Sequence, residues 1–332
     1  MSGAEALIEA GIGATRALVV DAGTVIEAHV ERDDGSPRAG SEHIARLTAI
    51  LVAGHRGLVR LGDTEVLVEP LPRVTEGALI RVQLVREAIP EAGRPRLPKA
   101  VPIDGPADKP GTVTPGADLR ARLIARGLRL VECGGPGEDR LESAGWSETV
   151  DQAQTGHVAF AAGMLTISPT PAMTVIDVDG PGDIMALAEA AAIAAAAAIR
   201  CFDLQGSIGI DLPTVAGKTL RTRLGDLLDA NLPPPFERTA VNGFGFVQIV
   251  RPRARASFVE SVRGPGFAAL ELLRRAGRGA PGARTLVAHP AVIAWLTARP
   301  ALVAALARQM GGPVALREDA RQAIAMGDVV PG

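Results

Sequence analysis

The pattern of hydrophobic and polar positions predicts that the chain begins with β-structure. Residues 16–32 form two runs rich in β-branched side chains on either side of Ala22 and Gly23, which predicts two strands joined by a turn. Residues 43–86 hold several short alternating runs, separated at short intervals by glycine and proline. About five closely spaced strands in so short a segment predict a small β-barrel.

The middle and the end of the chain follow a different pattern. Residues 89–116 are rich in proline and glycine, which predicts an extended linker. Helix signals appear at residues 118–127, and short strands are expected near residues 128–133 and 157–168. From residue 265 onward two helices flank an apolar strand, so the chain is expected to end in a small α/β segment.

One strand–helix–strand segment is the clearest in the sequence. A buried strand over residues 173–176 ends at Asp177, and a second apolar strand over residues 207–210 ends at Asp211. The alanine-rich stretch at 184–200 between them predicts a long helix. A helix between two such strands is typical of a βαβ unit, in which the strands run parallel.

Composition limits the kinds of protein that the chain can be. It has 332 residues, of which 47% are hydrophobic and 22% are charged, so two or three compact units are expected rather than a disordered chain. The net charge of −2 excludes a strongly basic protein but not a local cationic strip. Aromatic residues make up only 3% and tyrosine is absent, which excludes a large base-stacking surface.

Cysteine usage and hydropathy predict a cytoplasmic protein without contact to a membrane. The two cysteines, Cys133 and Cys201, are far apart in sequence, which argues against a disulfide scaffold and against a structural zinc site. The N-terminus carries no basic region ahead of an apolar run. The most apolar stretch, residues 184–199, is interrupted by Glu189 and rich in alanine, so it predicts a buried helix rather than a membrane span.

Two aspartates end the strands of the predicted βαβ unit. Asp177 and Asp211 occupy equivalent positions on strands about 4.8 Å apart, so their carboxylates could share one ion. Asp179 follows two residues later, on the same face if the strand continues. Close carboxylates repel each other, and a divalent cation such as Mg²⁺ relieves that repulsion. The alternative is that Asp177 and Asp179 form a turn and that Asp211 caps the following helix.

Several cationic side chains could contact a phosphate backbone. Arg251, Arg253 and Arg255 alternate after an apolar strand, so they could line one face. A solvated strand end explains the same pattern equally well. Lys218 belongs to a Gly-Lys-Thr sequence that opens a predicted helix, but Leu212 stands where a phosphate-binding loop requires glycine.

Residues 174–253 resemble the ribonuclease E/G family. The sequence Thr-Val-Ile-Asp-Val-Asp-Gly at 174–180 is similar to the family's magnesium-binding strand, and Ile-Asp at 210–211 is similar to its second metal-binding position. Asp-Leu-Gln-Gly at 203–206 resembles the family's Arg-Asp-Leu-Gly-Gly turn. Residues 242–253 resemble its Ser-Arg-Phe-Gly-Leu-Leu-Glu-Met-Ser-Arg-x-Arg motif. The order of N-terminal strands and predicted barrel is similar as well.

The resemblance implies an α/β fold with three parts. An RNase H-like catalytic core would be split between residues 1–38 and 100–255. Residues 39–99 would form an inserted OB-fold RNA-binding barrel with a linker. Residues 256–332 would form a small C-terminal α/β domain.

The resemblance also implies a magnesium-dependent endoribonuclease that cleaves single-stranded RNA in RNA processing or decay. Asp177 and Asp211 would bind Mg²⁺. Together with Asp179, which replaces the family's asparagine, they would be the catalytic residues. DNA is not an expected partner. The residues expected to bind RNA are Arg251, Arg253, Arg255 and Lys218.

The sequence also departs from the family pattern. Gly243 and Gln248 replace the motif's arginine and glutamate, and Leu58 and Leu67 lie near where the barrel would carry base-stacking aromatics. These departures favour an alternative, an RNA-binding paralogue without cleavage that serves as an adaptor or decoy. A metal-binding structural protein without RNA contact is a third option. The cysteine pair that binds zinc in many members is absent, so a zinc-linked tetramer is not expected, whereas a homodimer without zinc is allowed.

Overall fold

The computed structural model describes residues 3–91, 95–135 and 137–332. The chain forms two compact units, each built from separate stretches of sequence. The first unit contains residues up to 34, 127–155 and 261–332, and the second contains residues 35–126 and 156–260. These boundaries are not those of the three domains that the family resemblance implies, and that division stays a prediction.

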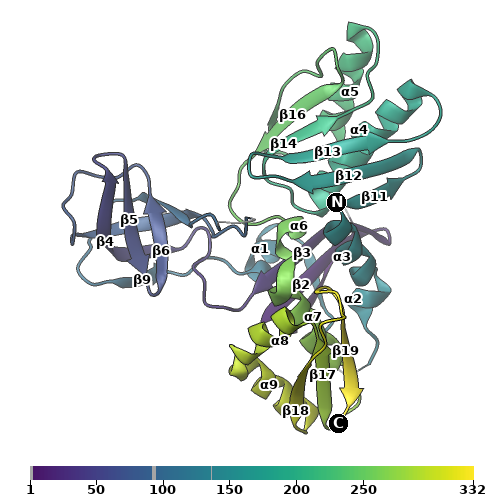
Figure 1. Cartoon of the computed structure of the whole chain (residues 1–332). Coiled ribbons are helices and arrows are strands. Elements are labelled where there is room, and N and C mark those ends of the chain that lie inside the picture. The colour runs from purple at the N-terminus through teal and green to yellow at the C-terminus, as the bar shows by residue number, and fades with distance from the viewer. Residues whose placement is uncertain (1–2, 92–94, 136) are drawn as a thin grey trace. The chain divides into compact units, whose positions relative to one another are not determined.

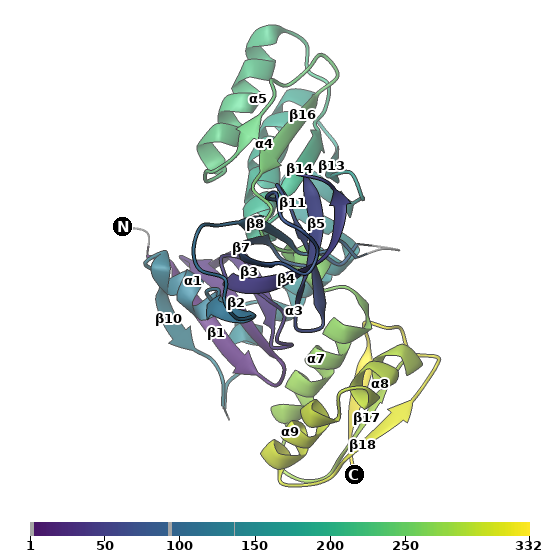
Figure 2. The same cartoon turned by 90° about the vertical axis from the view of Figure 1, so that its left-hand side faces the viewer.

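The first unit contains a four-stranded sheet in the order β10-β1-β2-β3 (Figure 2). Its strands are β1 (Glu5–Gly11), β2 (Ala14–Asp21), β3 (Thr24–Arg32) and β10 (Arg129–Glu132). The predicted turn at Ala22 and Gly23 joins β2 to β3 antiparallel, and both residues have the positive φ angles, 48° and 82°, that such a turn requires. β10 pairs parallel with β1, so a strand from much later in the sequence completes the N-terminal sheet.

Helices and a second sheet complete the first unit (Figure 1). The helices are α2 (Arg140–Ser143), α3 (Trp146–Thr155), α7 (Gly264–Gly277), α8 (Pro290–Thr297) and α9 (Pro300–Met310). The sheet contains β17 (Arg284–Ala288) between β18 (Val314–Glu318) and β19 (Gly327–Pro331). Leu270, Leu306 and Leu286 are buried in one core that joins α7, α8 and α9 to β17. The sequence predicted the central strand and its flanking helices but not β18 and β19, whose residues are mostly exposed or half-buried.

The second unit begins with a closed five-stranded barrel, consistent with an OB-like barrel (Figure 1). The strands follow the order β5-β6-β8-β7-β4, and pairing between β4 and β5 closes the ring. Alternate side chains such as Leu47, Val59 and Val82 fill its interior. The predicted barrel is confirmed. Its strands are β4 (Glu42–Val52), β5 (Arg56–Leu61), β6 (Thr64–Val68), β7 (Leu79–Arg86) and β8 (Lys99–Pro102).

The prediction of an extended linker at residues 89–116 is wrong in part, because this segment contributes two strands. β8 lies between β6 and β7 in the barrel, and β9 (Gly111–Thr114) pairs with β4. Proline lacks the backbone N–H that a strand donates, so it is tolerated at strand ends. Pro98 and Pro102 lie just before β8 and at its end. The prolines that indicated a linker therefore mark the limits of a short strand, and the predicted helix follows as α1 (Leu119–Ala125).

His43 of β4 is a buried titratable group in the barrel. Its Nε2 lies 2.7 Å from Oγ of Ser41, and its Nδ1 lies 3.3 Å from Oγ1 of Thr112 on β9. Burial disfavours the imidazolium and lowers the pKa of His43 below its ordinary value of 6.5. The unfolded chain therefore takes up this proton at a higher pH than the folded chain does.

The second unit is accordingly expected to lose stability as the pH falls below 6.5 toward the lowered pKa of His43. At higher pH, where His43 is neutral in both the folded and the unfolded chain, this loss should be absent. Chemical denaturation of the parent and of His43→Gln at about pH 7.5 and pH 5 measures the effect, since glutamine does not titrate. The parent should lose more stability on acidification than the variant does. Equal losses of stability in the parent and in His43→Gln would contradict the lowered pKa of His43.

The remainder of the second unit is a six-stranded mixed sheet in the order β11-β12-β13-β14-β16-β15, with two helices packed together (Figures 1 and 2). β13, α4 and β14 form the predicted βαβ unit, because β13 and β14 pair parallel on either side of α4 in sequence. These elements are β11 (His157–Phe160), β12 (Gly163–Pro169), β13 (Thr174–Asp179), α4 (Ile184–Cys201), β14 (Gly206–Asp211), α5 (Lys218–Asn231), β15 (Glu237–Arg238) and β16 (Phe246–Arg251), followed by α6 (Phe258–Ser261).

Helix α4 is the alanine-rich helix that the sequence predicted. Its carboxylate at the N-cap, Asp183, accepts a hydrogen bond of 2.9 Å from the backbone N–H of Ala186. One face of the helix, including Ala191, Ala195 and Ile199, is fully buried. By length and composition alone α4 could cross a membrane, as could α8 and α9 taken as one bent pair, but 44% of α4 is buried inside the protein. A buried face of this kind is typical of a core helix.

Candidate functional site

The parallel register of β13 and β14 brings two aspartates to neighbouring positions. Asp177 is the register partner of Asp211, one residue beyond the paired Ile176 and Ile210. Side chains alternate between the faces of a sheet, so the buried isoleucines point into the core while both aspartates point to the opposite face. Paired strands lie about 4.8 Å apart, which is close enough for the two carboxylates to share one cation.

Asp179 adds a third carboxylate to this face. It lies two residues after Asp177 within β13, and all three aspartates are exposed. Among the residues that the structure describes, none forms a hydrogen bond or an ion pair with the side-chain carboxylate of any of the three. We refer to Asp177, Asp179 and Asp211 as the carboxylate edge. Carboxylate oxygens without protein partners are available as ligands for a cation.

The alternative interpretation, a turn and a helix cap, is wrong. Asp177 and Asp179 belong to a strand rather than to a turn. Helix α5 begins at Lys218, with Gly217 at its N-cap and no side chain capping it, so Asp211 does not cap the helix that follows. The aspartate that does act as a cap in this βαβ unit is Asp183.

The carboxylate edge fits Mg²⁺ better than a cation that needs a complete protein cage. Within residues 3–91, 95–135 and 137–332, no group of three or more Asp, Glu, His or Cys side chains is arranged to hold a metal ion. Mg²⁺ usually keeps several water ligands and binds through one or two carboxylates together with substrate phosphates. The register pair Asp177 and Asp211 supplies that donor set.

The arginines expected to bind RNA are held by protein groups. Arg251 donates a 2.9 Å hydrogen bond to the carbonyl of Leu204. Arg253 donates to Glu260 at 2.6 Å, and a second guanidinium nitrogen lies 3.7 Å from Glu91. These contacts tie the segment after β16 to the rest of the second unit, and contact with RNA phosphates stays a prediction.

The arginines also lie away from the carboxylate edge. β16 ends at Arg251, so Arg253 and Arg255 follow the strand instead of alternating along it, and Arg255 lies 3.7 Å from the carboxylate of Asp203. Arg251 is the register partner of Gly206 at the start of β14, whereas Asp211 is at its end. A six-residue strand separates these two ends by about 16 Å.

Lys218 is the one predicted RNA-binding residue that the topology brings to the carboxylate edge. It is exposed, and it begins α5 only seven residues after Asp211 ends β14. The segment between them is not a phosphate-binding loop, because Leu212 is buried and its backbone N–H donates to the carbonyl of Gly245 at 3.3 Å.

Sequence reasoning missed an exposed aromatic residue at the same edge. Phe244 lies in the turn that precedes β16, and its side chain is 82% exposed. The Asn242-Gly243 dipeptide was the available signal, since this pair is typical of tight turns. Composition could not indicate Phe244, because a low content of aromatic residues does not show where those residues lie in the fold.

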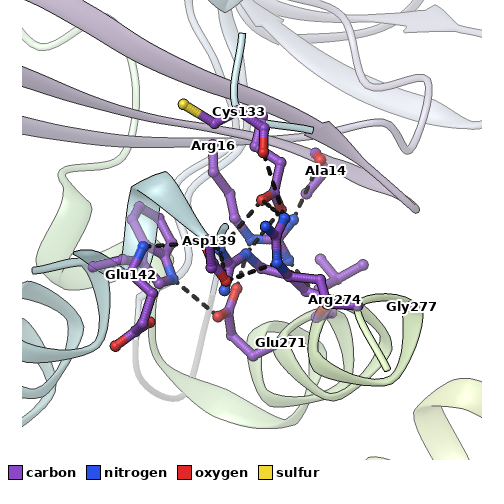
Figure 3. A network of polar contacts seen from close by, with 12 residues as sticks. Ala14, Arg16, Cys133, Asp139, Glu142, Glu271, Arg274 and Gly277 are labelled. Atoms are coloured by element: carbon purple, nitrogen blue, oxygen red, sulfur yellow. Dashed lines mark hydrogen bonds and ion pairs between the residues drawn. The ribbon is translucent and has the colours of Figure 1, made fainter. Parts of the chain in front are cut away.

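A buried ion cluster occupies the first unit (Figure 3). Arg16 is fully buried and donates to Oε1 of Glu271 at 2.6 Å, while Oε2 of Glu271 accepts from Nε1 of Trp146 at 2.9 Å. Arg274 donates to Glu9 at 2.8 Å. The charged members of the cluster are Glu9, Arg16, Asp139, Glu271, Arg274 and Arg278.

The charges of the buried ion cluster compensate one another. Three guanidinium groups face three carboxylates, and Asp139 pairs with both Arg274 and Arg278 at 2.6 and 2.9 Å. Every carboxylate is therefore engaged by a cation, which leaves no base free to accept a substrate proton. The cluster joins β1 and β2 to the segment after β10 and to α7, so we assign it a structural role.

Comparison with known protein families finds none that matches the chain, and comparison with curated proteins finds no similar protein. The assignment of the site therefore depends on its own geometry.

Proposed function

We propose that this protein is a magnesium-dependent endoribonuclease that cleaves single-stranded RNA, in RNA processing or decay, as the resemblance to the ribonuclease E/G family implies. The observation that carries the proposal is the pairing of Asp177 with Asp211 at the exposed end of two parallel strands. Neither carboxylate forms a bond with another described residue, so both are available to a cation that also contacts a phosphate.

Each aspartate has a role in this proposal. Asp177 and Asp211 hold Mg²⁺, which when bound supplies an activated water and neutralises developing charge on the phosphate. Asp179 lies on the same face of β13, where its carboxylate would serve as the base that accepts a proton at this site. Lys218, at the same edge, provides a cationic contact to the RNA backbone, whereas Arg251, Arg253 and Arg255 would contact RNA at the other end of β14.

We also propose a split RNase H-like core, an inserted OB-fold and a small C-terminal α/β part. The N-terminal sheet has three antiparallel strands followed by a parallel fourth, and the barrel is inserted between the third and the fourth. This arrangement supports a split RNase H-like core with an inserted OB-fold. The sheet that carries the aspartates is a different one. The helices and strands after residue 261 support a small C-terminal α/β part.

A second candidate is an RNA-binding protein that does not cleave. It is favoured by the small number of ligands, since the described residues contain no group of three or more metal-ligating side chains. Gly243 and Gln248, where the family motif has arginine and glutamate, point in the same direction. In this case the protein would act as an adaptor or decoy.

Incubation of the purified protein with a labelled AU-rich single-stranded RNA, in Mg²⁺ and in EDTA, tests the proposal. Cleavage is expected in Mg²⁺ and should stop in EDTA, because the carboxylates alone generate no nucleophile. Binding without cleavage under both conditions would support the second candidate. Failure both to bind and to cleave would overturn both.

A further inference from the structure

Phe244 has the most exposed large apolar side chain in the part of the chain that the structure describes, at 82%. Phenylalanine is ordinarily buried, and the whole chain contains only seven. A ring this exposed is available to a ligand, and covering it would remove a large apolar area from water.

Side-chain hydrogen bonds from two residues, Asn242 and Thr214, hold the turn that carries Phe244. Oδ1 of Asn242 accepts from the backbone N–H groups of Phe244 at 2.9 Å and Phe246 at 3.1 Å. Oγ1 of Thr214 donates to the carbonyl of Phe244 at 2.9 Å. Gly245 has a φ of +92°, and a Cβ there would collide with the carbonyl oxygen of Leu212. The ring is therefore presented on a fixed backbone.

The turn lies at the carboxylate edge. Phe246 is the register partner of Asp211, and β16 runs antiparallel to β14, so Phe244 lies just beyond the end of β14. Two further exposed apolar residues, Ile184 and Met185, begin α4 only a few residues after β13 ends. Exposed apolar side chains thus lie around the three carboxylates.

We propose that Phe244 stacks on an unpaired base of the RNA next to the phosphate that the carboxylate edge receives. The inference rests on the proposed function and adds a physical reason for the protein's preference for single-stranded RNA. Every base presents a flat face to an aromatic ring, so stacking does not select sequence. A base within a duplex has both faces occupied, so only a single strand can offer one. Phenylalanine has no polar group that could distinguish one base from another.

The negative charge of the carboxylate edge makes stacking by Phe244 more important for RNA binding. The carboxylate edge carries three negative charges and has Lys218 as its neighbouring cation, so it repels RNA in the absence of a divalent ion. Stacking does not depend on counterion release, whereas a phosphate contact does. The contribution of Phe244 to RNA affinity should therefore persist as salt rises.

The experiment compares a ten-nucleotide RNA with the same ribose-phosphate chain lacking its bases, in Mg²⁺ and at times too short for cleavage, so that the carboxylate edge can receive a phosphate while the RNA stays intact. Phe244→Ala is expected to weaken binding of the RNA about 5- to 100-fold and to leave binding of the abasic chain unchanged. Lys218→Ala should weaken binding of both ligands alike. It should also reduce the slope of the logarithm of the binding constant against the logarithm of the salt concentration by about 0.7. Met326→Ala removes a side chain that is 65% exposed in the first unit and should change neither.

Phe244→Trp gives an independent readout. The indole should keep RNA affinity, and its fluorescence should be quenched when a base stacks on it. Equal RNA affinities of parent and Phe244→Ala, or no quenching in Phe244→Trp, would overturn the inference while leaving cleavage by the parent as evidence for the proposed function. A parent protein that neither binds nor cleaves RNA would overturn both.

Discussion

An Asp211→Asn protein is expected to lose at least about 100-fold of its Mg²⁺-dependent cleavage of RNA, because a metal contributes several kcal/mol of transition-state stabilisation. An amide offers the cation a neutral oxygen in place of an anionic one. Asp177→Asn should have the same effect, since the two residues are register partners. The measurement is the single-turnover cleavage rate of a labelled single-stranded RNA.

The fold should survive both substitutions. Asp177 and Asp211 are exposed, and neither carboxylate makes a contact with another described residue that the substitution would break. Asp226→Asn on α5 removes the same charge from another exposed position of the second unit and should cleave at the parental rate. Parental rates in both Asp177→Asn and Asp211→Asn would refute the metal site, and a loss in Asp226→Asn would indicate an unspecific effect of charge.

Replacing Arg274 by methionine is expected to destabilise the first unit by about 3–5 kcal/mol, the usual effect of removing one partner from a buried ion pair. Glu9 would keep a buried carboxylate with its Arg274 contact removed, and Asp139 would lose its 2.6 Å contact. The side chains of Arg274 and Glu9 are only 4% and 5% exposed, so water cannot replace the missing guanidinium. Denaturant titration followed by circular dichroism measures the change.

Arg321→Met is the matched control for Arg274→Met. Arg321 also forms a salt bridge with an aspartate, Asp319, at 2.9 Å, but its side chain is 90% exposed. An exposed pair of this kind contributes little, so stability should remain close to that of the parent. Similar losses for Arg274→Met and Arg321→Met would show that burial does not determine the strength of the cluster.

Local patterns in the sequence predicted the parts of the fold that local forces determine. The hairpin around Ala22 and Gly23, the barrel strands and the βαβ unit each follow from periodicity and turn residues within a few tens of positions. The carboxylate edge could be predicted for the same reason, because parallel strands of a βαβ unit must end side by side.

Local sequence patterns could not predict interactions between segments that are far apart in the chain. Pairing of β10 with β1 joins residues that are separated by the whole barrel. Arg253 and Arg255 were expected to line one cationic face, and the fold instead pairs them with the carboxylates of Glu260 and Asp203. Phe244 was missed because exposure is a property of the folded turn and not of the residue type.

The discontinuity of the first unit has a consequence for synthesis on the ribosome. Arg16 and Glu271 are 255 residues apart in sequence, and Glu9 and Arg274 are 265 apart. β1 and β2 must therefore wait for the synthesis of more than 250 further residues before their buried charges meet partners. The barrel and the βαβ sheet, which are continuous segments, can form during this interval. A chain that stops before α7 would carry Arg16 and Glu9 without these partners, so premature termination should yield a product that is prone to degradation rather than a shortened, working protein.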